Sequence, residues 1–242
     1  MNSKVPKKKV RSYDNLHTFI YRLLKHYDPK ANMTAECKDI LNHLIRDLSL
    51  HYITACVELC RYAKKVTIDS NAIETLTNIW ITNPDYLIDF AHDTWDVYSQ
   101  NTTKGIKKSC RAGLFLPPAR FRELFREYRG ANQKIGEPAY IFLTAVIEAI
   151  FGLIIERAVH LARDEHKITV SGLHIYNAIN SKDFSHLYPL WNNSFIAGFG
   201  YIGNTLLQNA QERYIERKQN DREVTPDTAI NKIKIFNYKL NL

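Results

Sequence analysis

Apolar residues recur at three- and four-residue steps along two long stretches of the chain. In the first stretch they are Ile40, Leu41, Leu44, Ile45, Leu48, Ile53, Cys56, Val57 and Cys60. In the second they are Ile141, Phe142, Ala145, Val146, Ala149, Ile150, Leu153, Ile154, Ala158 and Leu161. This spacing predicts two amphipathic helices, each about 27 residues or roughly 40 Å long. A helix this long needs another long helix across its apolar face.

Shorter elements flank each long helix. Residues 15–26 and 118–128 carry apolar residues on one face and predict short helices before the long ones. Thr34 is a natural N-cap for the first long helix. The β-branched pairs Thr67-Ile68 and Thr169-Val170 predict very short extended segments. Another short helix is expected after each pair, beginning at Asp69 or Ser171. Residues 84–99 predict a further amphipathic helix.

The two stretches belong to an internal repeat with an offset of 102 residues. Lys65-Val66-Thr67-Ile68-Asp69-Ser70 aligns with Lys167-Ile168-Thr169-Val170-Ser171-Gly172 at that offset. Upstream, Phe19 and Leu23 align with Phe121 and Phe125 at the same spacing. Two halves therefore share one plan, a short helix, a long helix and a short helix.

Composition narrows the class of protein. The chain has 242 residues, 45% of them hydrophobic, which excludes disorder of the whole chain. Only 9 glycines and 8 prolines are present, which favours helices over a many-turned β fold. No run of about 18 uncharged apolar residues is found, so no membrane span is expected. No secretory signal is seen, and four cysteines without a Cys-x-x-Cys pair indicate a reduced, intracellular protein.

Positive charge is concentrated in two segments. The net charge is +8. Residues 1–11 carry Lys4, Lys7, Lys8, Lys9 and Arg11 with no acid, and residues 104–129 carry eight basic residues against Glu123 and Glu127. The rest of the chain is slightly acidic. This focusing indicates a polyanionic partner.

Catalytic and metal-binding patterns are missing from the sequence. It contains no Gly-x-Ser-x-Gly, no phosphate-cradling glycine loop and no His-Glu-x-x-His. His160 and His166 lack a third partner at metal-ligand spacing, and Cys56 and Cys60 lie on the apolar face of a helix. We therefore expect no enzyme activity, no catalytic residue, no metal site, no cofactor and no small-molecule substrate.

The helical plan and its motifs resemble histones. Residues 13–99, with Phe19-Ile-Tyr-Arg-Leu-Leu-Lys, Asp28-Pro29 and Lys64-Lys-Val-Thr-Ile-Asp-Ser, resemble histone two-B, including an extra C-terminal helix. Residues 108–200, with Arg111-Ala-Gly-Leu, Arg120-Phe, Ala145-Val-Ile-Glu and Ala162-Arg-Asp, resemble histone two-A. One chain with both partners in this order resembles the histone doublets of giant DNA viruses of the Marseillevirus group. The resemblance implies an all-α protein with two tandem histone folds paired as an intramolecular handshake heterodimer.

The resemblance also divides the chain. It implies a basic tail (1–12), a two-B-like fold with its extra helix (13–99), a basic linker (100–112), a two-A-like fold (113–188) and a docking-like extension (189–204). The C-terminal extension, 205–242, has no role that the sequence reveals.

Carried over position by position, the resemblance implies a set of DNA contacts and a docking surface. The DNA-binding residues would be Tyr21, Arg22, Thr34, Lys65, Thr67, Arg111, Arg120, Arg126, Lys134, Lys167 and Thr169. Thr169 stands where a minor-groove arginine is expected, which would weaken that contact. Of the acidic patch that binds chromatin factors, Glu148, Glu156 and Asp183 remain, whereas Leu153, Lys182 and Phe184 replace acids. A weakened patch is expected.

The function implied is structural DNA packaging. The doublet would pair with a second viral doublet resembling the other two core histones, two copies of each, and wrap double-stranded viral DNA largely independently of base sequence. The expected location is the virion and the infected host cell, in its nucleus or in a viral factory. The alternative is a histone-fold transcription regulator or DNA-binding regulator that does not wrap DNA.

Overall fold

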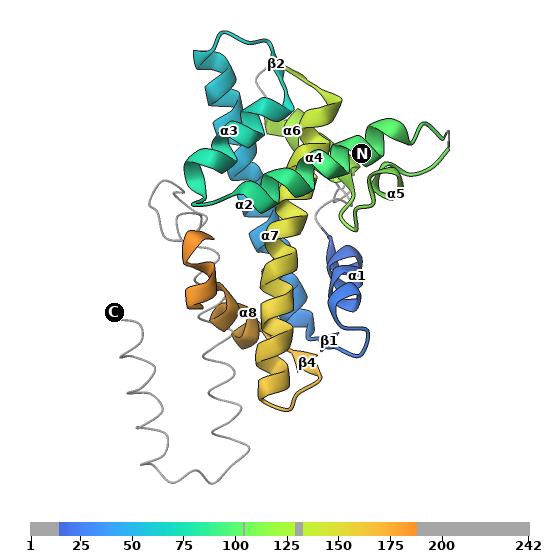
Figure 1. The fold of residues 1–242 in the computed structure, drawn as a ribbon, viewed down its shortest axis with the longest axis vertical. Helices are drawn as coiled ribbons and strands as arrows, with labels where there is room; N and C mark the ends of the chain where they lie inside the picture. The colour runs from blue at the N-terminus through green and yellow to red at the C-terminus, as the bar shows by residue number, and fades with distance from the viewer. Residues whose placement is uncertain (1–14, 104, 129–132, 188–242) are drawn as a thin grey trace, which may run out of the picture.

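The computed structural model describes residues 15–103, 105–128 and 133–187, and within them the chain is almost entirely helical (Figure 1). The elements in chain order are α1 (His17–Tyr27), β1 (Asn32–Met33), α2 (Ala35–Tyr62), β2 (Thr67–Ile68), α3 (Ser70–Trp80), α4 (Asp85–Gln100), α5 (Lys108–Ala112), α6 (Pro118–Tyr128), β3 (Lys134–Ile135), α7 (Glu137–Asp164), β4 (Thr169–Val170), α8 (Gly172–Ile179) and the 3₁₀ helix η2 (Lys182–Leu187). The predicted basic tail, the docking-like extension and the C-terminal extension lie outside the described residues.

The predicted repeat is present in the positions of the elements. The long helices α2 and α7 have 28 residues each. They begin at Ala35 and Glu137 and end at Tyr62 and Asp164, so both pairs of ends are 102 residues apart. The two-residue strands β1 and β3, which the sequence did not predict, obey the same offset.

The two long helices also end in the same way. Lys64 and His166 follow them in the left-handed conformation, with φ of 54° and 57°. Lys65 N donates to Cys60 O at 2.9 Å, and Lys167 N donates to Ala162 O at 2.8 Å. This is a Schellman motif built without glycine. It turns the chain sharply so that β2 and β4 can run beside the other half.

Short parallel strands join the first half to the second. β1 pairs with β4, with Asn32 opposite Thr169, and β2 pairs with β3, with Thr67 opposite Lys134. The long helices α2 and α7 are in contact with each other. Figure 1 shows β2 near one end of these helices and β1 and β4 near the other. The loops of the two halves therefore meet in two separate places.

The hydrophobic core follows α7, the most buried element. Phe142 and Phe151 of α7 and Tyr52 of α2 are among the largest fully buried side chains. By length and composition alone α7 could cross a membrane, but 83% of its most apolar 18-residue window is buried inside the protein. The core helix of a soluble protein has the same properties, and Glu148 interrupts the apolar run.

The helix caps that the sequence predicts are confirmed for α2 and α3. Thr34 Oγ1 accepts the N–H of Cys37 at 3.1 Å, and Asp69 Oδ1 accepts that of Ala72 at 3.2 Å. Before α8, the Ser171 N–H donates to His174 Nδ1 at 3.0 Å, and the two side chains form a capping box. These bonds satisfy backbone donors at the helix starts.

The segment predicted as a linker contains helix α5, which is held against both halves. Lys108 of α5 forms an ion pair with Glu137 at the start of α7 and donates to Tyr140 Oη at 2.5 Å. Arg111 Nε donates to the carbonyl oxygen of Asn101, just after α4, at 2.7 Å. The polar composition that suggested a linker also supplies these contacts.

Candidate nucleic-acid interface

The first cluster of polar groups surrounds the β1–β4 pair, and Tyr21, Lys25 and Lys38 are half-buried there. Tyr21 Oη donates to Asn32 Oδ1 at 3.2 Å. The ammonium groups of Lys25 and Lys38 lie 5.2 Å and 4.8 Å from the centre of the Tyr21 ring. This is within the range of cation–π attraction. Thr169 is exposed beside them. Two cations therefore gather on one tyrosine at this end of the molecule.

Lys167 at the same end is already paired. Its ammonium contacts the Glu165 carboxylate, and that carboxylate also lies 3.4 Å from Nε2 of buried His174. Because His174 Nδ1 accepts the Ser171 N–H, the proton of a neutral ring is assigned to Nε2, facing Glu165. Burial raises the pKa of Glu165, but the bonds from Lys167 and His174 outweigh it and lower that pKa overall. Lys167 thus gives this surface less net charge than its sequence position implied.

The second cluster surrounds the β2–β3 pair. Lys64, Lys65, Thr67 and Lys134 are all exposed there. Lys65 Nζ lies 3.7 Å from Asp69 Oδ2. An ion pair this accessible to water is weak, so the Lys65 ammonium stays available to a partner. Lys134 stands opposite Thr67 in the strand register. Lysines from both halves and a hydroxyl therefore face solvent at this end.

The start of α7 adjoins this second cluster and has its own acid. Gly136 is the N-cap, without a side-chain cap. A Cβ atom on Gly136 would lie 3.2 Å from the carbonyl oxygen of Ile68, so glycine allows the close approach of β2. Glu137 follows it. Burial raises the pKa of Glu137, but hydrogen bonds from Lys108, Tyr98 and Tyr140 hold it at about 2. This carboxylate is ionised and paired beside the helix terminus.

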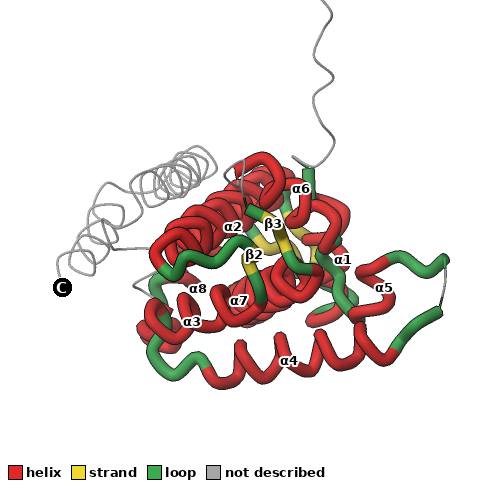
Figure 2. Tube along the Cα trace, turned by 90° about the horizontal axis from the view of Figure 1, so that it is seen from above, coloured by secondary structure: helices red, strands yellow, loops and turns green. Residues whose placement is uncertain are grey.

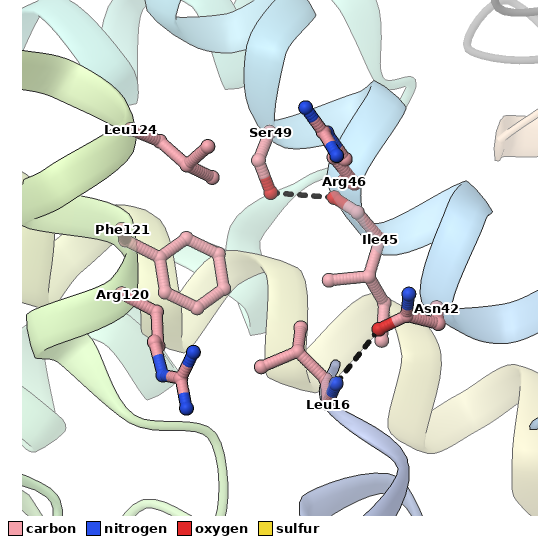
Figure 3. A pocket seen from close by; sticks show the side chains of 8 residues that line it. All are labelled: Leu16, Asn42, Ile45, Arg46, Ser49, Arg120, Phe121 and Leu124. Carbon is pink, nitrogen blue, oxygen red and sulfur yellow. Dashed lines mark hydrogen bonds between the residues drawn. The ribbon is translucent and has the colours of Figure 1, made fainter. Parts of the chain in front are cut away.

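Arg120 lies between the two ends, at the start of α6. Figure 3 shows it with Phe121 and Leu124 on the α6 side of a small pocket, facing Asn42, Ile45, Arg46 and Ser49 of α2. Leu16, just before α1, closes the pocket, and its N–H donates to Asn42 Oδ1 at 2.8 Å. Within the described ranges, Nη1 of Arg120 is buried without a hydrogen-bond partner. The guanidinium as a whole is half-buried, and it would have to turn outward before this donor could meet an anion from outside.

The other predicted DNA contacts are placed differently. Arg111 stacks on Tyr98 at 4.1 Å and donates to backbone oxygens of residues 98 and 101, at 3.2 Å and 2.7 Å. It thus holds the end of α4. Arg22 and Arg126 are exposed on α1 and α6, and Thr34 is engaged as the α2 cap. DNA contact by these residues stays a prediction.

The three acids of the predicted patch do not form one exposed group. Glu148 is buried, and its carboxylate accepts the N–H groups of Phe115 at 3.1 Å and Leu116 at 2.6 Å. Burial raises its pKa to about 7, against the opposing effect of those two bonds. Asp183 lies 3.3 Å from Arg157, and Glu156 is half-buried.

Sequence reasoning missed several residues of these clusters. Lys25 and Lys38 were not singled out, although Lys25 is one helical turn from Tyr21, a spacing that brings side chains together. Asp28 was noted only as part of a helix break. It is buried and pairs with Arg163 of α7 at 2.7 Å. No sequence pattern links residues so far apart.

Comparisons with known proteins identify the family. No family model matches the chain. The histone two-A of Kluyveromyces lactis is 37% identical over 97 residues, which are 40% of this chain and 72% of that protein. A histone two-A of Saccharomyces cerevisiae has the same identity over 97 residues, 71% of its length. Histone H2AX of Tetrahymena pyriformis is 29% identical over 126 residues, 51% of this chain and 89% of that protein.

Among solved structures, the histone from Methanopyrus kandleri matches 68% of this chain and 92% of its own, with a TM-score of 0.47 and 14% identity. The sequence matches carry the conclusion. The chain is a histone-type protein with an all-α histone fold. It belongs to the histone two-A family, through a match that covers 40% of its length.

Family membership places the chain among structural DNA-packaging proteins rather than enzymes. Within the residues that the structure describes, no group of three or more His, Cys, Asp or Glu side chains could hold a metal ion.

Proposed function

We propose that the chain is a fused pair of histone folds, a two-B-like half followed by a two-A-like half, that packages viral DNA. The observation that carries the proposal is the pairing of loops from the two halves at both ends of the crossed helices α2 and α7. At β2–β3 both halves contribute exposed lysines, so this part of the DNA-binding surface would be complete only when both halves are assembled. Fusion fixes their ratio and raises their effective concentration.

DNA would run over three contact points. The β1–β4 cluster offers Tyr21, Lys25 and Lys38, and the β2–β3 cluster offers Lys64, Lys65 and Lys134. Arg120 lies between them, and after its side chain turned outward the guanidinium would enter a minor groove or meet a phosphate. Lys167 would first have to leave Glu165. These groups recognise the backbone rather than base edges, so binding would depend little on sequence.

The particle would contain this doublet and a second viral doublet that resembles the other two core histones, two copies of each. The predicted docking-like extension, 189–204, would meet that partner. The resemblance to doublets of the Marseillevirus group assigns the protein to the virion and to the infected host cell, in its nucleus or in a viral factory.

Nuclease digestion of DNA mixed with this protein, alone and with the second doublet, tests the proposal. A discrete protected fragment that appears only with both doublets is the expected result. A smear in both mixtures would contradict wrapping. That smear together with a strong preference for one base sequence at constant salt would favour the alternative, a histone-fold regulator.

Salt dependence tests the contact residues themselves. The logarithm of the affinity for DNA is expected to fall linearly with the logarithm of salt, by about 0.9 for each phosphate neutralised. The double variant Lys64→Gln/Lys134→Gln should reduce that slope by roughly 1 to 2. Arg61→Gln is the control, because Arg61 is exposed nearby but pairs with Glu58. An equal slope in all three proteins would rule out contact at the β2–β3 cluster.

A further inference from the structure

The outer face of α4 carries an exposed row of large apolar side chains. Tyr86, Phe90 and Val97 are spaced by four and seven residues and are 40%, 39% and 51% exposed. The adjoining face of α4, one residue further along at each position, carries Leu87, Ala91 and Tyr98, which are buried on the side that packs on α7. An exposed row of this kind on a helix is typical of a docking surface.

Acidic residues run along the same helix beside this row. Asp85, Asp89, Asp93 and Asp96 are separated by four, four and three residues, so they share one face of α4. All four are exposed, and none forms an ion pair with any residue in the described part of the chain. The neighbouring basic group, His92, instead lies 3.3 Å from Glu74. The acids and the apolar row together form what we term the α4 face.

We propose that the α4 face binds the basic N-terminal segment, residues 1–11, of a second copy of this chain. The segment reads Met-Asn-Ser-Lys-Val-Pro-Lys-Lys-Lys-Val-Arg, with five cations and no acid, and two valines stand among the cations. Extended, it spans about 36 Å, enough to follow the 16-residue helix α4, which is about 24 Å long. The C-terminal segment 205–242 carries seven cations against five acids and complements the face poorly.

The position of α1 indicates that the α4 face binds residues 1–11 of a second copy rather than those of its own chain. Leu16 lies against α2 and α6, where it lines the pocket with Asn42 and Arg120. Figure 2 shows α4 on the other side of α7 from α2 and α6. A segment leaving Leu16 would have to go around the molecule to reach its own α4. The same segment could reach the α4 face of a neighbouring copy without going around its own molecule. DNA would compete for the cations of residues 1–11, so we expect this docking in the protein that is not bound to DNA.

Charge reversal in the full-length chain tests the proposal by sedimentation velocity at low salt. One variant reverses the face, Asp89→Lys/Asp93→Lys, and the other reverses the segment, Lys8→Glu/Lys9→Glu. Each alone should associate with itself about tenfold more weakly than the natural chain. A mixture of the two should associate again, because the natural segment of the face variant fits the natural face of the segment variant. High salt should weaken both associations.

The control variant is Glu123→Lys/Glu127→Lys on α6. It changes two exposed acids at the same four-residue spacing and should associate like the natural chain. Circular dichroism of every variant verifies the fold. No recovery in the mixture would overturn docking between copies. If a lysine-rich peptide of unrelated sequence displaced the segment at equal concentration, the face would be a site for basic segments in general, and the assignment to residues 1–11 would be wrong.

Discussion

At the scale of single residues, neighbours decide what each ionisable side chain can do. Glu148 was expected on an acidic surface, but it is buried and receives two backbone N–H groups from the segment before α6. Arg111, whose contact with DNA stays a prediction, holds the end of α4. In both cases the side chain satisfies backbone groups of its own protein, which water or a partner would otherwise have to satisfy.

Glu148 makes stability depend on pH. Its pKa is about 7 in the folded protein and near 4.5 in the unfolded chain. Between these values the folded state keeps a proton that the unfolded state loses, so stability falls as pH rises from about 5 to 8. The full loss is on the order of 3 kcal/mol. Urea unfolding of Glu148→Gln should lack this part of the fall.

The comparison between the natural chain and the variant isolates Glu148 from other groups. Burial lowers the pKa of His174, and the hydrogen bond with Glu165 opposes this shift only in part. The lowered pKa contributes stability that is lost as pH falls, so the effect of His174 is opposite to that of Glu148. Glu156→Gln is the control, because it makes the same chemical change eight residues further along α7, where the side chain is only half-buried. Identical pH profiles for the natural chain and Glu148→Gln would contradict the assignment.

At the scale of elements, ion pairs across the two halves fix how the helices meet. Arg163 near the end of α7 pairs with buried Asp28 at the end of α1, across 135 residues of sequence. Burial raises the pKa of Asp28, but the N–H groups of Lys30 and Ala31 and the Arg163 guanidinium lower it overall. The repeat-related residue, Arg61, pairs with half-buried Glu58 of its own helix.

This difference predicts unequal effects of two matched substitutions. Arg163→Ala leaves the buried Asp28 carboxylate without its cation and should destabilise the protein by about 2–4 kcal/mol. Arg61→Ala removes an exposed pair and should cost about 0.5 kcal/mol or less. Chemical denaturation of both variants at neutral pH measures the two values. Equal losses would mean that the pair across the halves does not contribute as argued.

At the scale of the whole molecule, the two halves complete each other. Helices α1, α2, α3 and α4 of the first half all pack on α7 of the second, and each strand pair takes one strand from each half. Isolated halves would expose these surfaces to water, so association should persist without the covalent connection.

Cleavage between the halves tests this. A protease site inserted after Thr103 should be cut, because residues 102 and 103 are exposed and lie outside helices. The two fragments should then elute together in size-exclusion chromatography and retain the circular dichroism of the intact chain. Fragments that separate, or that lose helix on cutting, would show that the connection itself holds the fold together.

The sequence by itself determined the helices of the repeat and α4, the caps at Thr34 and Asp69, and the offset of 102 residues, but not α5, which lies in the segment predicted as a linker. These depend on short-range periodicity and on bonds between residues three or four positions apart, which a chain displays directly. Family resemblance added the two candidate loops. Lys65 and Lys134 are exposed there, and their contact with DNA stays a prediction.

Only the tertiary structure decided which charges remain available. Lys167 pairs with Glu165, Lys108 with Glu137, and Arg163 with Asp28, whereas Nη1 of Arg120 has no partner in the described ranges. The burial of Glu148 and the gathering of Lys25 and Lys38 on Tyr21 depend likewise on packing. The energy of a charge depends on its surroundings in space, and residues distant in sequence supply those surroundings.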